Sequence, residues 1–313
     1  MVVARRTPEI MNKFQSTPKR IKLDEMDISL GKKTRLYRML YEHGPANGTL
    51  MILPIDQGIE HGPLNFFPNP PSEDPDFQYK LAFEGGFSAI ALHIGLAAKY
   101  SRKYVGRVPL ILKINGKTNV PSDDNAFSPL TSSVEDAVRL GADAAGYTLY
   151  AGSPSQDRDI KQLNDVRFEC EKFGMPLIVW SYPRGSAIDS KGGKDSLYAI
   201  DYAARLACEF GADVVKLNVP KIDESKLDKL PKPYNTLKLS YEESVAKVVR
   251  SAGKTMVLFS GGSKESDEDL LRKARACMSN GATGIIFGRN MWQREFSNAM
   301  AISKQIKQIM LGS

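Results

Sequence analysis

A repeat of helix and strand constrains the fold of this chain more than any other feature of its sequence. Four segments share a glycine, a small or polar spacer and then an apolar run: EGGFSAIALH, RLGADAAGYTL, EFGADVVKLN and SNGATGIIFG. They alternate with four segments in which a helix end leads quickly into an apolar run: GPANGTLMILPID, GRVPLILKIN, FGMPLIVWSY and SAGKTMVLFS. Helical patterns such as DSLYAIDYAARLACEF separate most of these runs. Strands that alternate with helices form a parallel sheet.

The repeat predicts eight strands, near residues 51–56, 88–93, 110–114, 143–149, 176–180, 213–217, 255–259 and 283–287. Eight units of strand and helix, in which two kinds of segment alternate, indicate an α/β fold of the closed (β/α)8 TIM-barrel type. A doubly wound open sheet is the alternative. A chain of 313 residues has an ordinary length for one such barrel.

The first 28 residues differ from the repeat, because they mix charges of both signs with little apolar periodicity. Their basic residues would suit a targeting presequence, but acidic residues such as Glu9 and Asp24 argue against one. We expect an N-terminal extension over residues 1–28, flexible or packed against a neighbouring subunit. The barrel domain is then expected over residues 29–313.

Composition excludes several classes of protein. The chain has no apolar run long enough to cross a bilayer and no secretory signal core, so we expect a cytoplasmic protein without a membrane partner. The net charge of +7 is spread along the chain, and no zinc-finger, RNP or helix-turn-helix pattern occurs, which argues against a nucleic-acid partner. A net positive charge suits a protein that binds anionic, phosphorylated substrates. Cys170, Cys208 and Cys277 lie far apart without CxxC spacing, which indicates reduced thiols.

Loop lengths place the chemistry at one face of the barrel. The connections from helix to strand are short, such as FGM and AGK, whereas several connections from strand to helix are long and polar, such as YPRGSAIDSKGG. TIM barrels place their active sites in the loops at the carboxyl ends of the strands. We therefore expect the functional residues there.

A lysine stands inside the predicted sixth strand, in the sequence GADVVKLNVP. Because side chains alternate along a strand, Val214, Lys216 and Asn218 share one face, and Val215 and Leu217 share the other. The apolar pair suits the helix layer, so Lys216 points into the barrel mouth. A desolvated lysine has a lowered pKa and can form a Schiff base with a carbonyl. The alternative is a lysine paired with a carboxylate inside the barrel.

Two other strands bring reactive groups to the same mouth. Lys113 lies in the third strand, and alternation points it inward as well, so the spacing leaves open which lysine is the nucleophile. Trp180 and Tyr182 share a face at the end of the fifth strand and provide an aromatic wall and a phenol able to act as an acid or base. Arg184 follows, where a guanidinium can hold a phosphate. Ordinary packing for Tyr182 and a solvated role for Arg184 are the alternatives.

Glycine-rich loops follow the seventh and eighth strands. Ser260, Gly261 and Gly262 begin one loop, and Gly288 and Arg289 begin the other at the start of a helix. Loops after these two strands commonly bind phosphate in TIM barrels, because bare backbone N–H groups and helix N-termini face the anion. We predict a phosphate site here. The GGSK sequence lacks the spacing of a P-loop.

The first strand ends in PIDQGIEHG, where Asp56 and His61 lie close to the predicted mouth. A zinc site needs several converging ligands, and the chain has three histidines, of which His43 precedes the first strand. We therefore expect no metal and no cofactor. Asp56 suits a hydrogen bond to a substrate hydroxyl or to an ammonium group, with a solvated loop position as the alternative.

These motifs together resemble the archaeal-type class I fructose-bisphosphate aldolases. The resemblance runs from about residue 30 to the C-terminus and rests on DQGIEHGP, DVVKLN, WSYPRG, SGG and FGRN in this order. It implies that Lys216 forms the Schiff base and that Tyr182 transfers protons. It also implies that Arg184 and His61 bind the far phosphate. The near phosphate would lie on Ser260, Gly261, Gly262, Gly288 and Arg289.

The resemblance further implies the reversible cleavage of fructose 1,6-bisphosphate into dihydroxyacetone phosphate and glyceraldehyde 3-phosphate, without a metal. It implies a homo-oligomer, since the family forms large rings, often decamers. Two alternatives stay open at this point. The same lysine could serve a related aldolase, a transaldolase or a thiolase that acts on another phosphorylated keto compound. A non-catalytic barrel that binds a phosphate ligand would instead hold Lys216 in an unreactive ion pair.

Overall fold

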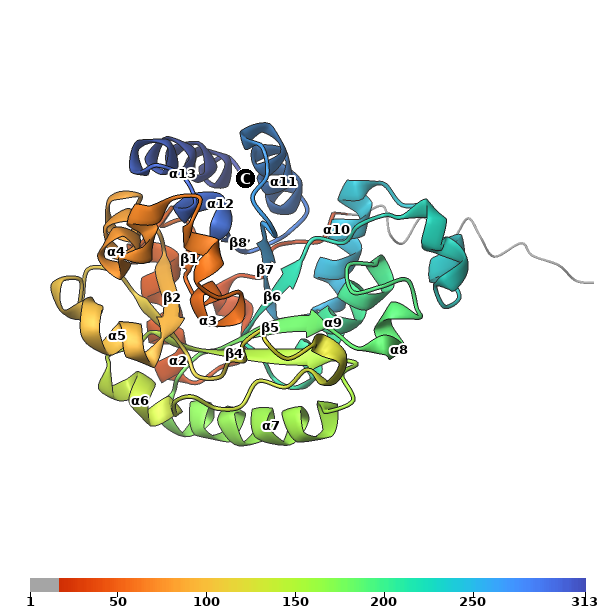
Figure 1. Cartoon of the computed structure of the whole chain (residues 1–313), viewed down its shortest axis with the longest axis horizontal. Helices are drawn as coiled ribbons and strands as arrows, with labels where there is room; N and C mark the ends of the chain where they lie inside the picture. Colours follow the sequence, from red (N-terminus) through yellow and green to blue (C-terminus); the bar gives the residue numbers. More distant parts are fainter. Residues whose placement is uncertain (1–16) are drawn as a thin grey trace, which may run out of the picture.

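Eight parallel strands close into a barrel in sequence order, with β1 paired to both β2 and β8 (Figure 1). The computed structural model describes residues 17–313. Its strands are β1 Leu50–Pro54, β2 Ala89–His93, β3 Leu110–Lys113, β4 Ala144–Ala151, β5 Leu177–Pro183, β6 Val214–Asn218, β7 Met256–Ser260 and β8 Gly284–Ile286. The predicted (β/α)8 TIM barrel is confirmed, and the doubly wound open sheet is wrong because the first and last strands pair.

Helices surround the strands as an outer layer (Figure 1). The α-helices are α2 Leu30–Tyr37, α3 Gln57–Glu60, α4 Pro75–Glu84, α5 Ile94–Tyr100, α6 Val134–Arg139, α7 Gln156–Phe173, α8 Ser186–Asp189, α9 Leu197–Glu209, α10 Tyr241–Ser251, α11 Asp267–Ser279, α12 Arg289–Trp292 and α13 Phe296–Leu311. Short 3-10 turns are η1 Leu23–Glu25, η3 Pro63–Phe66, η4 Pro70–Glu73, η5 Ser101–Lys103, η6 Asp123–Asn125, η7 Glu224–Lys229 and η8 Tyr234–Thr236, and η2 Arg38–Glu42 is a π-helical turn. Among residues 17–313, no helix combines the length and apolar character that a membrane span requires.

Local sequence explains where several helices begin and end. Ser240 accepts a hydrogen bond from the Glu243 N–H, and Glu243 bonds back to Ser240, which forms a capping box at the start of α10. Ser133 and Asp136 form the same box at the start of α6. Gly174 ends α7 with a φ of 57°, in the left-handed region that favours glycine. These signals set the ends of α6, α7 and α10, which return the chain to the start of β4, β5 and β7.

Alternation along the strands divides the core into two layers. Inside the barrel lies one cluster of buried side chains, which includes Ile52, Ile178 and Val214. Between strands and helices lies the larger cluster, which includes Val215 and Leu217. Lys216 therefore shares the inner face with Val214, as the sequence predicted.

The segment that precedes β1 covers the amino ends of the strands. Leu23 of η1 is 2% exposed and joins the inner cluster together with Leu36 of α2. Lys32 pairs with Glu171, and at 3.0 Å with Asp213 just ahead of β6. Residues 17–28 of the predicted extension therefore contact the barrel of their own chain, while residues 1–16 lie outside the described residues. The domain boundary at residue 28 stays a prediction.

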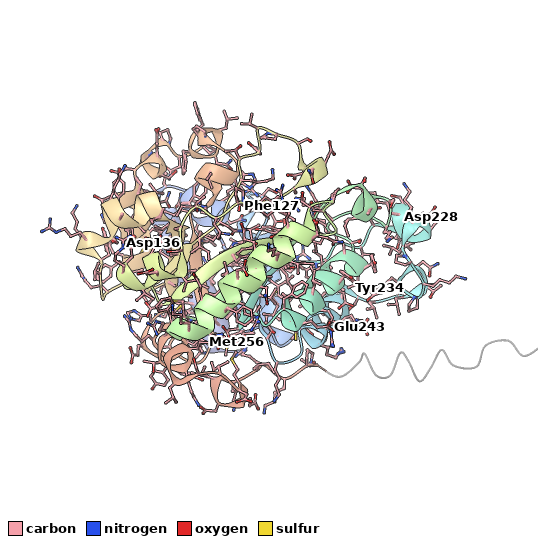
Figure 2. The ribbon with its side chains drawn as sticks, turned by 90° about the horizontal axis from the view of Figure 1, so that it is seen from below. Phe127, Asp136, Asp228, Tyr234, Glu243 and Met256 are labelled. Carbon is pink, nitrogen blue, oxygen red and sulfur yellow. The ribbon has the colours of Figure 1, made fainter. Side chains whose placement is uncertain are left out.

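Long connections lie at the carboxyl ends of the strands. The connection between β6 and α10 contains η7 and η8. It lies at one end of the molecule, where Figure 2 labels Asp228 and Tyr234. Together with the connection between β5 and α9, it lines a cavity of about 1010 Å³. Arg184 is among its lining residues, so this cavity adjoins the barrel mouth.

Candidate active site

Lys216 of β6 lies buried in the barrel mouth and is 5% exposed. Its Nζ donates a hydrogen bond to the Tyr182 hydroxyl and lies 4.1 Å from the centroid of that ring. Burial lowers the pKa of Lys216 to about 7, although the negative charges of Asp56 and Glu60 act in the opposite direction. Among the ion pairs of residues 17–313, none joins Lys216 to a carboxylate. The amine is therefore available as a nucleophile near neutral pH.

Tyr182 lies one residue before the end of β5, on the inner face beside Lys216. Burial raises the pKa of its phenol well above the ordinary value, and the nearby charges of Glu60 and Asp56 raise it further. The phenol therefore keeps its proton near neutral pH. It can donate that proton to a carbon or oxygen atom that develops negative charge.

Lys113 is fully buried on β3 and forms a polar corner of the site. Its Nζ donates a hydrogen bond of 2.5 Å to the Thr148 hydroxyl, lies 3.8 Å from an Asp56 carboxylate oxygen and stands 4.3 Å from the Trp180 ring centroid. Burial lowers the pKa of Lys113, while Asp56 and Glu60 oppose that shift. Trp180 is 1% exposed and its ring packs against Lys113.

Gly146 of β4 makes room for this corner, and sequence reasoning missed it. A Cβ at this position would lie 2.9 Å from Lys113 Cδ and 2.9 Å from Trp180 Cζ3. Any side chain would therefore displace Lys113 or Trp180. The glycine stands inside an apolar strand run, where a glycine often marks a close approach of neighbouring groups, and that position was the available signal.

Glu60 is the second group that sequence reasoning missed. It ends the short helix α3, and its N–H lies 3.4 Å from the carbonyl oxygen of Asp56, so one helical turn brings both carboxyl groups to the mouth. Burial, followed by the charge of Asp56, raises the pKa of Glu60 to about 7. The spacing of Asp56 and Glu60, four residues apart after a strand, was a usable signal.

The loops after β7 and β8 lie against each other, since the Asn290 side chain of α12 donates a hydrogen bond of 2.9 Å to the Ser263 carbonyl. Ser260 donates a hydrogen bond of 2.8 Å to Asn218 Oδ1, and Gly262 has a φ of 74° with no described atom within 4 Å of its missing Cβ. Gly288 precedes α12, which is one turn long. The Arg289 Nε is buried and has no hydrogen-bond partner in the described part of the chain. A guanidinium whose buried Nε lacks a partner, next to glycine backbone, suits an anion.

Arg184 and His61 lie elsewhere around the mouth. Arg184 is half-buried, pairs at 3.0 Å with Asp123 and stands 5.2 Å from the Tyr182 ring centroid. Burial lowers the pKa of His61, and the charge of Arg289 lowers it more than that of Arg184 does. His61 thus lies within the fields of both cations, and its assignment to the far phosphate stays a prediction.

The remaining histidines lie apart from any cluster of metal ligands. Within residues 17–313, no group of three or more His, Cys, Asp or Glu side chains is arranged to hold a metal ion. His93 ends β2, where burial lowers the pKa of its imidazole to about 4. His43 follows η2 ahead of β1, as the sequence predicted. The three cysteines form no disulfide, and Cys170 and Cys277 are buried.

Comparisons with known proteins agree with this geometry. The DeoC/LacD family of aldolases matches residues 50–294. A Thermoproteus tenax protein named fructose-bisphosphate aldolase class 1 is 38% identical over 266 residues, which are 85% of this chain and 90% of that protein.

Solved structures of fructose-bisphosphate aldolases also superpose on the chain. An archaeal fructose-1,6-bisphosphate aldolase, with its catalytic lysine bound to the carbinolamine intermediate of the substrate, is 36% identical, with a TM-score of 0.75 over 88% of this chain and 100% of that one. A fructose-bisphosphate aldolase from Slackia heliotrinireducens is 27% identical, with a TM-score of 0.79 over 94% and 92%. The chain belongs to the DeoC/LacD family of aldolases.

Proposed function

We propose that this protein is a class I fructose-bisphosphate aldolase, which cleaves fructose 1,6-bisphosphate reversibly through a Schiff base on Lys216. The observation that carries the proposal is a buried amine whose pKa falls to about 7 and which has a phenol as its hydrogen-bond partner. The names of the relatives support the choice of substrate. The unsatisfied Arg289 beside the glycine loops supports a phosphorylated ligand.

The reaction begins when the Lys216 amine attacks the C2 ketone and loses water to give an iminium, which then draws electrons from C3. A base removes the proton of the C4 hydroxyl, the C3–C4 bond breaks and glyceraldehyde 3-phosphate leaves. Tyr182 protonates C3 of the enamine, because its raised pKa keeps the phenol protonated. Hydrolysis then releases dihydroxyacetone phosphate.

The other groups of the mouth position the substrate. Asp56 and Lys113 form a charged pair beside Trp180, able to bind sugar hydroxyls. Ser260, Gly261, Gly262, Gly288 and Arg289 bind one phosphate in this proposal. Arg184 and His61 bind the other at the opposite end of the sugar.

Two other functions compete with this proposal. A related aldolase, transaldolase or thiolase would use Lys216 on a different phosphorylated keto compound. A phosphate-binding barrel without catalysis would hold Lys216 in an ion pair, and the described residues provide no such pair. We favour catalysis for that reason.

A trapping experiment tests the proposal. Incubation with dihydroxyacetone phosphate and borohydride should add one reduced adduct to Lys216, located by mass spectrometry on the peptide of residues 211–220. Product analysis with fructose 1,6-bisphosphate tests the substrate in parallel. An intact peptide without an adduct would remove the Schiff base, an adduct without cleavage would favour a related substrate, and loss of cleavage with EDTA would favour a metal mechanism.

The wider setting of the enzyme is part of the same proposal. We expect a cytoplasmic homo-oligomer, in the decamer range that the family resemblance implies, with a phosphorylated sugar as its ligand. Neither a cofactor nor a nucleic-acid or membrane partner belongs to this proposal. The spread of the +7 net charge along the chain supports the last two points.

A further inference from the structure

The side chain of Asn218 connects the end of β6 to the loop that follows β7. Asn218 and Ser260 are partners in the register of these two strands, and the Ser260 hydroxyl donates a hydrogen bond of 2.8 Å to Asn218 Oδ1. Asn218 lies two residues beyond Lys216, so alternation places both side chains on the inner face. The first residue of the predicted phosphate loop is thereby tied to the strand that carries the lysine.

Asp195 is the partner at the other end of the Asn218 amide. It lies in the connection between β5 and α9, and its Oδ1 accepts a hydrogen bond of 3.1 Å from Asn218 Nδ2. A carboxylate accepts hydrogen bonds and donates none, so the NH2 group of Asn218 must face Asp195. The amide oxygen then faces Ser260 and accepts its hydroxyl proton. Asp195 therefore decides how the Asn218 amide is turned.

Two contacts with Lys221 hold Asp195 in place. The Lys221 Nζ lies 3.0 Å from Asp195 Oδ2, and the Lys221 N–H donates a hydrogen bond of 2.8 Å to the Asp195 carbonyl oxygen. Burial alone would raise the pKa of Asp195, but the hydrogen bonds from Lys221 and Asn218 lower this pKa below its ordinary value. The carboxyl group is therefore ionised at neutral pH and acts only as an acceptor.

The direction of these hydrogen bonds determines what Ser260 can offer a ligand. The hydroxyl has one proton, and Asn218 accepts it, so the hydroxyl cannot donate to a phosphate at the same time. The oxygens of a phosphate dianion accept hydrogen bonds and donate none. The Ser260 hydroxyl therefore anchors the loop, and N–H donors such as the loop backbone and the Arg289 guanidinium are left to meet the phosphate.

We propose that Asp195 is a positioning residue for the phosphate, because through Asn218 and Ser260 it sets where the phosphate loop lies relative to Lys216. This inference deepens the proposed function and rests on it. Without Asp195 the Asn218 amide can turn, and the Ser260 end of the loop loses its fixed place. Binding of a phosphorylated ketone should then weaken, while the Lys216 amine keeps its reactivity.

The test compares two ketones that differ in the phosphate group. Dihydroxyacetone phosphate and dihydroxyacetone present the same ketone to Lys216, and borohydride traps the Schiff base of either one. We expect Asp195→Ala to raise the concentration of dihydroxyacetone phosphate that gives half-maximal trapping by about 10-fold, with little change in the trapping of dihydroxyacetone. Asp189→Ala is the matched control, because Asp189 lies exposed on the same connection between β5 and α9.

A double variant tests whether Asp195 and Asn218 act as one chain. Asn218→Ala should weaken the trapping of dihydroxyacetone phosphate as much as Asp195→Ala does. The double variant should then resemble either single variant, because breaking the chain at a second point has no further effect. Losses that multiply in the double variant would overturn the proposal.

The outcomes separate this inference from the proposed function. A wild-type protein that traps neither ketone contradicts the aldolase proposal itself. A wild-type protein that traps dihydroxyacetone phosphate, together with an Asp195→Ala variant of unchanged concentration dependence, overturns the role of Asp195 alone. Equal losses with both ketones would show a general structural defect and overturn that role as well. If Asp195→Ala fails to fold, Asn218→Ala decides the question by the same comparison.

Discussion

At the scale of single residues, one physical cause acts on two neighbouring groups in opposite directions. Burial disfavours charge, so it lowers the pKa of Lys216 and raises that of Tyr182. Near neutral pH the phenol is then uncharged and a substantial fraction of the Lys216 amine is unprotonated, which gives the site a nucleophile and an acid in direct contact. Lys113 Nζ and an Asp56 carboxylate oxygen lie 3.8 Å apart nearby, where they can orient polar ligands.

Replacement of Tyr182 by phenylalanine separates these two roles. We expect Tyr182→Phe to lower the kcat for cleavage of fructose 1,6-bisphosphate by about 100- to 1,000-fold, because the variant lacks the acid that protonates C3. The borohydride adduct should still form, since Lys216 remains buried. Steady-state kinetics and trapping on the same sample measure both effects. If borohydride trapping falls as much as cleavage does, Tyr182 is instead needed for the reaction of the Lys216 amine with the ketone.

Some of these residues could be predicted from the sequence and others could not. Strand alternation alone placed Lys216, Lys113 and Trp180 on the inner face, because the period of two is fixed by the backbone. Glu60 lies in the connection between β1 and α4, whose path depends on contacts with other strands, so its position was missed. Gly146 was missed because its role appears only when Lys113 and Trp180 lie on either side of it.

At the scale of elements, the loops after β7 and β8 act as one unit joined by Asn290. The Asn290 side chain donates to the Ser263 carbonyl at 2.9 Å and accepts from the Glu265 N–H at 2.8 Å. A Cβ at Gly261 would lie 2.6 Å from Asn290 Nδ2. The glycine therefore allows the first loop to approach the second.

We expect Gly261→Ala to weaken phosphate binding by displacing Asn290. The KM for fructose 1,6-bisphosphate should rise about 10-fold or more, since hydrogen bonds to a charged ligand contribute about 1.5–3 kcal/mol each. Inhibition by inorganic phosphate should weaken in parallel, and both are measured by steady-state kinetics. Gly95→Ala is the control, because no described atom lies within 4 Å of that Cβ position. Equal effects of the two variants would contradict the assignment.

Element boundaries were predicted within a few residues wherever a glycine and an apolar run stood together. The short helices α3 and α8 were not, because they are one turn long and depend on the barrel around them, whereas the start of α12 was predicted at Gly288 and Arg289. The burial of Leu23 could not be predicted from the sequence. Its segment has the composition of a charged extension, and the surface that buries Leu23 forms only when the strands close into the barrel.

At the scale of the whole molecule, stability and chemistry occupy opposite ends of the barrel. The amino ends of the strands are covered by η1 and α2, with the ion pairs of Lys32. The carboxyl ends keep buried polar groups without partners, such as Glu60 and Arg289. This division is common in TIM barrels, where the loops at the carboxyl ends carry function. The mouth should therefore contribute less to stability than its burial suggests.

Replacement of Lys216 by methionine measures how much the burial of this amine lowers the free energy of unfolding. Between about pH 7 and 10.5 the native protein holds fewer protons on Lys216 than the unfolded chain does, so its free energy of unfolding rises with pH. The Lys216→Met variant lacks this dependence. We expect it to be more stable than wild type at about pH 6, and its advantage to shrink by about 2–3 kcal/mol by about pH 9. Urea unfolding at both pH values measures the difference, and Lys191→Met, at an exposed position, is the control. An advantage that does not change with pH would show that the amine is charged in the folded protein, which contradicts its role as the nucleophile.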